Sequence, residues 1–218
     1  MATYTSLINS VLRRVRESEV AGPTSTTYAA LVGDFVNETK REVEDAWKWS
    51  MLRQTISVNT VQSADTISVL GAGNRWKLQD PLYSVYNATS KDYLCKANNV
   101  AFERDAVDDV TEGTPAEYVF EGQDANGDPE VRLYQIPDGV YAINFKLIVP
   151  QDDFSTGAEV LKVPDYPVLM GAIAKALAER GEDNGSTSGE GYNRYQLALN
   201  DAISVDEART TGETTWYV

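Results

Sequence analysis

Apolar residues recur at the spacing of an amphipathic helix in two blocks near the start of the chain. In the first block these positions are Leu7, Ile8, Val11, Leu12 and Val15. In the second block they are Leu31, Val32, Phe35, Val36, Val43, Ala46 and Trp47. Thr3 or Thr5 can cap the first predicted helix, and Ser25, Thr26 or Thr27 can cap the second.

The hydrophobic period changes from helical to alternating at Arg53. Beyond it, Ile56, Val58 and Val61 alternate with polar residues, a pattern typical of a strand with one covered face. Residues 28–61 contain no glycine or proline linker between the two patterns apart from Gly33 inside the helix. The pattern therefore predicts one long helix that runs directly into a strand, which would join a helical layer rigidly to a β layer.

The middle of the chain reads as a series of short strands. They are expected at residues 66–70, 75–78, 82–87, 93–97, 116–121, 131–136 and 140–149. Turn sequences rich in glycine, asparagine and aspartate separate them at residues 71–74, 124–128 and 137–139. We expect an antiparallel β-sandwich or a barrel-like sheet.

Helical spacing returns after Pro150. Pro164 or Pro167 suits the first turn of a third helix, whose many small residues would let another backbone approach closely, and Gly181 can end it. A loop rich in glycine and serine, residues 182–191, leads to a fourth helix that carries Tyr192, Tyr195, Leu199, Ala202 and Ile203. Residues 210–218 form a polar tail with an apolar tip.

The predicted fold class is α+β. The N- and C-terminal helix pairs, residues 1–52 and 160–209, are expected to close into a four-helix bundle. Residues 53–159 would form a β-rich domain inserted into the bundle, and residues 210–218 a C-terminal docking tail.

Composition indicates a folded protein. The 218 residues are 42% hydrophobic and 24% charged, close to the averages of globular domains. No apolar run could span a bilayer and the first twenty residues lack a signal-peptide pattern, so we expect no membrane partner and synthesis in the cytosol. The single cysteine, Cys95, is expected to be a small buried apolar residue.

The formal net charge is −14, and residues 101–138 hold eleven acidic residues against two arginines. Such a surface repels phosphates, which disfavours conventional DNA binding. The acidity either serves solubility or forms a surface past which DNA slides without sticking.

The residue types that catalysis needs are missing. The chain has no histidine, which excludes Ser-His-Asp and Cys-His pairs and every histidine-containing metal site. It has no Walker phosphate loop, and Gly71-Ala72-Gly73 reads as a tight turn because Trp76 takes the place of the third glycine of a dinucleotide loop. We therefore expect no enzyme, no catalytic residue and no cofactor.

Acidic residues do not form a metal or hydrolase motif either. The segment from Asp124 to Asp128 begins like a calcium loop, but Pro129 and Gln135 occupy the positions that need glycine and glutamate. Adjacent carboxylates such as Asp108-Asp109 and Asp152-Asp153 are expected by chance among 33 acidic residues. A hairpin turn and solvated loop charge account for both.

Two pairs of aromatic residues have different expected roles. Trp47 and Trp49 are expected to fill the helical bundle and its boundary with the β-rich domain. Trp216 and Tyr217 stand at the end of the polar tail, away from any local core. They are either a docking anchor for a partner or a tail that packs on its own subunit.

Several segments resemble podovirus-type phage head-to-tail adaptors, the gatekeeper or tail tubular protein A group. They are NETKREVEDAWKW at 37–49 running into a strand, GTPAEY at 113–118, VRLYQIPDGVYAINF at 131–145, Pro150, and the proline-initiated helix with small residues. Together they cover most of the chain. They are packing and turn patterns without a catalytic signature.

The resemblance implies a structural protein at the head-tail junction of the virion. It implies a homo-oligomeric ring of about twelve copies between the portal protein and the tail nozzle, through which double-stranded DNA passes during ejection without specific binding. In such adaptors the C-terminal segment often docks on the portal, and here that segment ends in Thr214, Thr215, Trp216, Tyr217 and Val218.

In a ring, the mixed charges of the second helix become candidates for contacts between neighbouring subunits: Asp34, Glu38, Arg41, Glu42, Asp45 and Lys48. Two other functions stay open. The aromatics and carboxylates would also suit a carbohydrate-binding or hydrolysing β module, and another neck or tail ring component could have a similar build.

Overall fold

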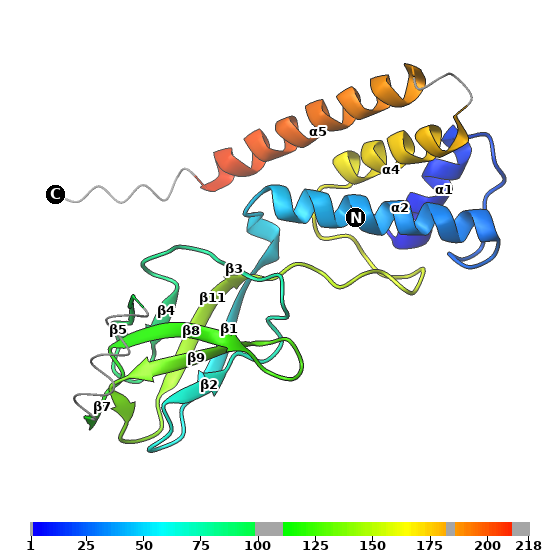
Figure 1. Ribbon diagram of the computed structural model, residues 1–218. Coiled ribbons are helices and arrows are strands. Elements are labelled where there is room, and N and C mark those ends of the chain that lie inside the picture. The colour runs from blue at the N-terminus through cyan, green and yellow to red at the C-terminus, as the bar shows by residue number, and fades with distance from the viewer. Residues whose placement is uncertain (1, 99–110, 182–185, 211–218) are drawn as a thin grey trace. The chain divides into compact units, whose positions relative to one another are not determined.

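The computed structural model describes residues 2–98, 111–181 and 186–210 (Figure 1). The fold is mixed α+β, as predicted, and the chain divides into two compact units. A helical unit comprises Met1–Leu52 and Pro150–Val218, and a β-rich unit comprises Arg53–Val149. The described strands of the β-rich unit form separate sheets and do not close into a barrel.

The described part of the helical unit contains four α-helices, α1 (Tyr4–Arg14), α2 (Thr27–Ala46), α4 (Asp165–Arg180) and α5 (Ser186–Thr210). Thr3 caps α1 in a reciprocal capping box with Ser6, and the Thr26 hydroxyl accepts a hydrogen bond from the Ala29 amide at the start of α2. Gly181 ends α4 in the left-handed conformation. The predicted caps are confirmed, because they depend only on neighbouring residues.

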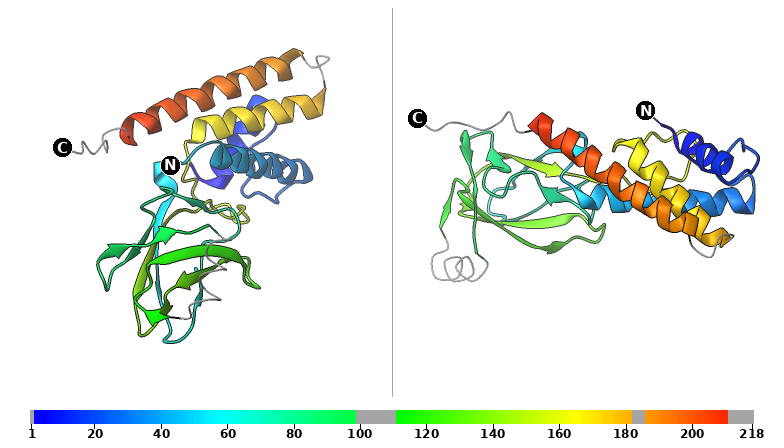
Figure 2. Two further views of the ribbon diagram at one scale, coloured as in Figure 1. Left: turned by 60° about the vertical axis from the view of Figure 1, so that its left-hand side comes forward. Right: turned by 90° about the horizontal axis from the view of Figure 1, so that it is seen from above.

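Helix α4 packs against α1, α2 and α5 (Figure 2). A β-carbon on Gly171 would collide with Thr39 of α2 and approach Tyr195 of α5. Gly191 of α5 leaves room for α4, since a β-carbon there would stand 3.2 Å from the Ala174 Cα atom. The prediction that small residues allow close helix contact is therefore confirmed. This contact also extends α5 to Ser186, so the predicted loop over residues 182–191 is too long.

Helix α2 does not continue into a strand, and this prediction is wrong. The helix ends at Ala46, Trp47 is extended with φ −145°, and a 3₁₀ turn, η1 (Ser50–Leu52), precedes strand β1 (Arg53–Asn59). The reason is tertiary. The buried carboxylate of Asp206 on α5 accepts hydrogen bonds from the Trp47 indole and from Ser50, which holds these residues outside the helix.

The larger sheet of the β-rich unit has the strand order β1-β11-β4-β5, and β3 also pairs with β11. The bounds of the added strands are β3 (Lys77–Leu78), β4 (Val85–Asn87), β5 (Asp92–Tyr93) and β11 (Ala142–Ile148). Strand β1 pairs with β11 in antiparallel register from Arg53 opposite Ile148 to Asn59 opposite Ala142. The first and last strands of the unit are therefore direct neighbours.

A four-stranded sheet has the order β2-β9-β8-β6, and a separate pair joins β10 to β7. These strands are β2 (Thr66–Ser68), β6 (Cys95–Lys96), β7 (Glu112–Gly113), β8 (Glu117–Gln123), β9 (Pro129–Tyr134) and β10 (Ile136–Pro137). Most of the described strand pairs are antiparallel, as predicted, and the β6–β8 and β10–β7 pairs are parallel. One hydrophobic cluster takes side chains from both larger sheets, among them Val85, Tyr118, Val131, Ile143 and Phe145.

Cys95 is exposed, which overturns its expected burial. Side chains alternate between the two sides of an extended chain. Leu94 is buried and occupies the core position, so the next side chain, that of Cys95, faces outward.

The turn at residues 124–128 closes the β8–β9 hairpin, as predicted. It also binds the loop that contains Gly71 and Gly73. The Asp128 carboxylate accepts hydrogen bonds from the amides of Gly71 and Gly73 at 3.0 and 2.7 Å. Both glycines have positive φ angles, 84° and 65°, which L-residues with side chains rarely adopt. The backbone N–H groups of Gly73 and then Gly71 lower the pKa of Asp128 below its ordinary value.

Asp128→Asn should lower the melting temperature of the β-rich unit at neutral pH. A carboxyl group whose pKa is lowered by folding stabilises the protein above its unfolded pKa of about 3.9, and this contribution is lost as the pH falls through the folded pKa. The difference in melting temperature between the wild type and Asp128→Asn should therefore shrink below about pH 4. Circular dichroism melts from pH 7 to pH 2.5 measure it, and a difference independent of pH would contradict the assignment.

Candidate functional site

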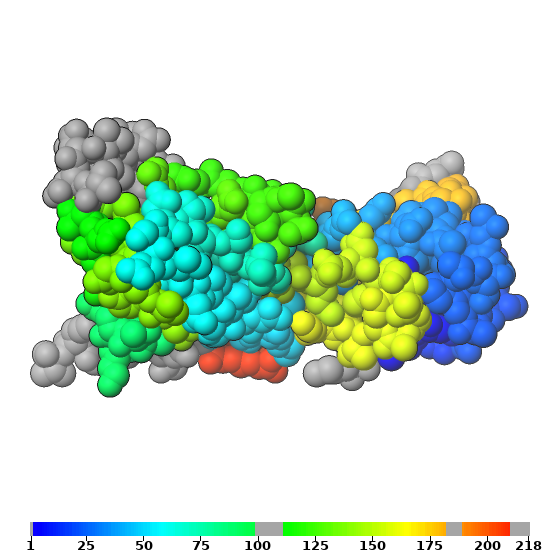
Figure 3. All heavy atoms as spheres, turned by 90° about the horizontal axis from the view of Figure 1, so that it is seen from below, coloured from blue at the N-terminus to red at the C-terminus, as the bar shows by residue number. Residues whose placement is uncertain are grey.

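A network of hydrogen bonds and ion pairs in the helical unit holds the segment that follows the β-rich unit. We call residues 150–163, between β11 and α4, the return segment. It contains no helix or extended strand of its own, yet it lies along the first two helices (Figure 3). Residues 150–159, grouped with the β-rich domain in the sequence pattern, pack on the helical unit.

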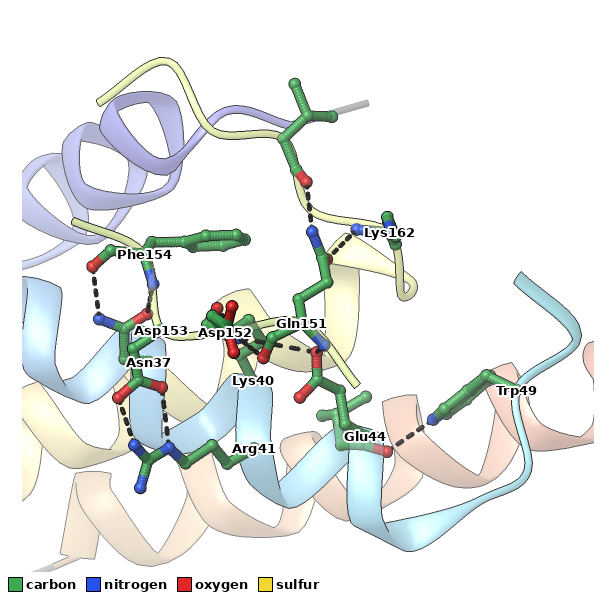
Figure 4. Close-up of polar contacts among 12 residues, drawn as sticks. Asn37, Lys40, Arg41, Glu44, Trp49, Gln151, Asp152, Asp153, Phe154 and Lys162 are labelled. Carbon is green, nitrogen blue, oxygen red and sulfur yellow. Dashed lines mark hydrogen bonds and ion pairs between the residues drawn. The ribbon is translucent and has the colours of Figure 1, made fainter. Parts of the chain in front are cut away.

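One face of α2 binds the start of the return segment through Asn37, Lys40, Arg41 and Glu44 (Figure 4). These positions follow the spacing i, i+3, i+4 and i+7, so they lie on adjacent turns of one helix face. The Asn37 side chain donates to the Phe154 carbonyl oxygen at 3.0 Å and accepts from the Phe154 amide at 2.9 Å. The Asn37 side chain thereby binds both backbone groups of Phe154, as a residue of a neighbouring antiparallel strand would.

We call the side chains of Asn37, Lys40, Arg41 and Glu44 the clamp. Lys40 and Glu44 form its buried centre, and both side chains are 0% exposed. The Lys40 Nζ atom donates to the carbonyl oxygens of Gln151 and Asp152 at 2.8 and 2.7 Å, and it stands 3.7 Å from the Glu44 Oε1 atom. The same Glu44 oxygen accepts from the Gln151 amide at 3.1 Å. Each buried charge therefore has an opposite charge and a backbone partner, which offset the cost of removing it from water.

Arg41 adds an exposed ion pair to the clamp. Its guanidinium donates two hydrogen bonds to the Asp153 carboxylate, and this contact raises the pKa of Arg41 above its ordinary value. Both side chains are largely in water, where ion pairs stabilise little. Arg41 therefore fixes the direction of the segment more than it contributes to stability.

The second half of the return segment pairs with residues that precede and begin α1. The amides of Tyr4 and Thr5 donate to the carbonyl oxygens of Glu159 and Gly157 at 2.9 and 3.1 Å, and the Leu161 amide donates to the Ala2 carbonyl oxygen at 3.0 Å. The Tyr4 ring also lies 5.4 Å from the Phe154 ring, and burial raises the pKa of Tyr4 to about 12. The return segment is therefore held by two helices.

The other connection to the β-rich unit, residues 47–52, is anchored as well. Trp49 is 0% exposed, and its indole N–H donates to the Val43 carbonyl oxygen at 2.6 Å. Asp206, which is 2% exposed, accepts from the Trp47 indole, the Ser50 amide and the Ser50 hydroxyl at 3.2, 3.0 and 2.5 Å. Both chain connections are thus bound to the helical unit next to the residues where they leave it.

A family model described as SU10 adaptor protein matches residues 2–216. The chain belongs to the SU10 adaptor protein family. No curated protein sequence matches it significantly. Membership in this family supports a phage adaptor, a structural virion component that associates with other virion parts such as portal and tail, and it implies a role other than catalysis. The clamp is therefore interpreted as part of a structural protein.

In residues 2–98, 111–181 and 186–210, no three Cys, Asp or Glu side chains come together as a metal site. No helix in these ranges is long and apolar enough to cross a bilayer. The buried charges of the clamp are bound to backbone groups of their own chain, so their chemistry serves the fold.

The charges proposed for subunit contacts are all exposed on α2 or just after it. Glu38, Glu42 and Arg41 form ion pairs within the chain. Lys175 of α4 donates to both Glu38 and Glu42 at 2.9 Å, and Arg41 binds Asp153. Asp34, Asp45 and Lys48 complete the set. The docking residues Thr214, Thr215, Trp216, Tyr217 and Val218 lie outside the described residues.

Sequence reasoning missed four residues that anchor the two connections to the helical unit: Asn37, Lys40, Glu44 and Asp206. A signal was present for two of them. Lys40 and Glu44 fall at i+4 and i+8 from Val36, which places them on the apolar stripe instead of the charged face. A charged pair spaced by four residues on an apolar stripe indicates a buried ion pair. Nothing local marks Asp206, whose partners lie 156 or more residues away.

Proposed function

We propose that this protein is a podovirus-type head-to-tail adaptor of the gatekeeper or tail tubular protein A kind. About twelve copies form a ring between the portal protein and the tail nozzle, and double-stranded DNA passes through the ring. The observation that carries the proposal is the match to an adaptor family over residues 2–216. In this proposal the four helices act as one bundle and the β-rich unit as an inserted sandwich-like domain.

The clamp suits this role because an adaptor must transmit force without unfolding. Force applied to the β-rich unit reaches the helical unit through two chain connections. Trp49 and Asp206 anchor one, and Lys40, Glu44 and Asn37 anchor the other. Buried polar contacts of this kind break only when the helical unit opens locally. The anchors therefore protect the unit from fraying at both points.

The net charge of −14 supports passage of DNA without capture. A wall of like charge gives phosphates no counterion-releasing contact, so DNA gains no affinity for it. We assign Asp34, Glu38, Arg41, Glu42, Asp45 and Lys48 to contacts between neighbouring subunits, where the mixed signs would allow a row of opposite charges to meet. Ring assembly that depends on these contacts should weaken as salt rises.

Assembly with the portal tests the function directly. The purified protein is mixed with the portal protein of the same phage and studied by mass photometry and negative-stain imaging. A ring of adaptor copies on one end of the portal is the expected result. Subunits that stay monomeric at all protein and salt concentrations, with no density added to the portal, would refute the proposal.

Deletion of residues 210–218 should weaken binding to the portal while the fold stays intact. The tail ends in Trp216 and Tyr217, and aromatic side chains dominate the energy of many protein interfaces. A pull-down on immobilised portal measures the loss, and circular dichroism verifies the fold. The matched control replaces residues 210–215 by glycine and serine and keeps the aromatic tip. Equal binding by wild type and deletion variant would remove the docking role.

A further inference from the structure

A groove of about 320 Å³ opens on the helical unit beside the last turns of α5. We call it the α5 groove. Its lining includes Met51, Tyr166, Ala198, Ala202, Val205 and Arg209. Met51, Tyr166 and Val205 are large apolar side chains that remain 46%, 58% and 55% exposed. An apolar hollow with three such side chains at its edge is the kind of surface that another apolar group covers.

The groove is built from residues with fixed positions. Ala198, Ala202, Val205 and Arg209 recur every three or four residues and therefore lie on one face of α5. The two alanines leave the space, while Val205 bounds it. Met51 is positioned because the neighbouring Ser50 is hydrogen-bonded to Asp206. The hollow therefore exists before any partner arrives, which lowers the entropic cost of filling it.

The segment that follows α5 has the right composition to fill this hollow. Beyond Thr210 the sequence reads TGETTWYV, whose large apolar residues are Trp216, Tyr217 and Val218. Aromatic side chains of this size each bury about 150–250 Å² of surface when they pack against other apolar groups. Gly212 allows the chain to reverse direction, since glycine adopts both signs of φ. Arg209 at the rim offers a cation to Glu213, the charged side chain of this segment.

The segment after Thr210 is also long enough for Trp216 to reach the groove. Trp216 lies six positions after Thr210, and an extended chain covers about 3.3 Å per position, or about 20 Å in all. The face from Arg209 back to Ala198 spans eleven residues of helix, or about 16 Å at 1.5 Å per residue. A second hollow, lined by Tyr192, Tyr195 and Gly189, lies fifteen or more residues before Thr210, or about 22 Å or more. The α5 groove is therefore the closer of the two binding sites for Trp216 and Tyr217.

We propose that Trp216 and Tyr217 occupy the α5 groove of their own chain in the free subunit. The aromatic tip is then kept from water and from neighbouring molecules until a stronger binding site displaces it. This inference does not depend on the portal or on ring formation, because the groove, the tip and the connecting residues belong to one subunit.

Disulfide formation between two introduced cysteines tests the proposal. In a Cys95→Ser background, Val205→Cys is placed at the groove and Thr215→Cys beside the aromatic tip, so both aromatic residues stay. The matched control pairs Thr215→Cys with Ser204→Cys. Ser204 is exposed, adjoins Val205 in sequence and lies outside the α5 face that lines the groove, because successive helical residues are turned by about 100°.

At low micromolar protein, mild oxidation should cross-link the 205–215 pair within one chain at least about tenfold faster than the 204–215 pair, because a seated tail raises the local thiol concentration. Adding Trp216→Ser and Tyr217→Ser should remove this difference. Both rates are read by mass spectrometry under native conditions. Equal rates for the two pairs, a difference that survives the serine substitutions, or disulfide-linked dimers as the main product would each overturn the proposal.

Discussion

Lys40→Met should destabilise the helical unit by about 3–5 kcal/mol, the usual cost of removing one partner of a buried ion pair. The substitution removes the ammonium group that stands 3.7 Å from the Glu44 carboxylate in a site that is 0% exposed. It also leaves the carbonyl oxygens of Gln151 and Asp152 without the ammonium donor that reaches them at 2.8 and 2.7 Å. Methionine matches the shape of the lysine stem, so packing changes little and the loss is mainly electrostatic.

Urea unfolding followed by circular dichroism at 222 nm measures the loss in the helical unit. Hydrogen exchange shows where it acts, and protection of the Gln151 amide, which donates to Glu44 at 3.1 Å, should fall first. The matched control is Arg41→Met on the next residue, which removes an exposed ion pair to the same segment and should cost far less. Similar losses for the two variants would contradict the buried role of Lys40.

The double variant Lys40→Met with Glu44→Leu separates charge from shape. It should recover part of the stability lost by Lys40→Met, because no unpaired charge remains. Recovery should be incomplete, since the backbone groups of Gln151 and Asp152 lose their side-chain partners.

Trp49→Ala should cost a similar amount, about 3–5 kcal/mol, through the cavity that it leaves. Trp49 is 0% exposed and stands in the connection between α2 and β1. Its indole donates to the Val43 carbonyl oxygen at 2.6 Å, a group near the end of α2. Helix ends have carbonyl groups without intrahelical partners, so this contact also helps to end the helix. The variant should therefore lose both packing and a C-terminal partner of α2.

Trp49→Phe is the control that separates the loss of packing from the loss of the hydrogen bond to Val43. Phenylalanine keeps most of the ring but cannot donate to the Val43 carbonyl oxygen, so the loss should be about 1–3 kcal/mol. Differential scanning calorimetry at one protein concentration measures both variants. If Trp49→Phe proved as damaging as Trp49→Ala, the hydrogen bond rather than the packing would carry the effect. If neither changed stability, Trp49 would not anchor the connection.

Local signals were sufficient for much of the fold. Thr3 and Thr26 were among the predicted N-caps and Gly181 was the predicted helix end, because capping depends on residues within one turn. The turns at residues 71–74 and 124–128 were predicted for the same reason, since glycine with positive φ is a property of the backbone itself. Each predicted strand segment contains a strand, although several strands are shorter than predicted.

Errors appeared where a distant residue decides the local structure. The end of α2 depends on Asp206, and Trp47 lies 159 residues away from it along the chain. The first turns of α5 are helical although glycine and serine disfavour a helix there, because Gly191 packs closely on Ala174 of α4. The error at Cys95 has a local cause instead: Cys95 is exposed because the neighbouring Leu94 takes the core position.

By itself, the sequence determined the mixed α+β composition, the starts of the first two helices, the turns, and a type of protein consistent with its adaptor family. Hydrophobic period and capping act over a few residues, so they can be recognised locally. Only the tertiary structure decided that Lys40 and Glu44 are buried and hold the return segment, whose contacts to them span 107 to 112 residues of chain. A charged side chain can be buried only where folding supplies its partners, and those partners are chosen by the packing of the whole helical unit.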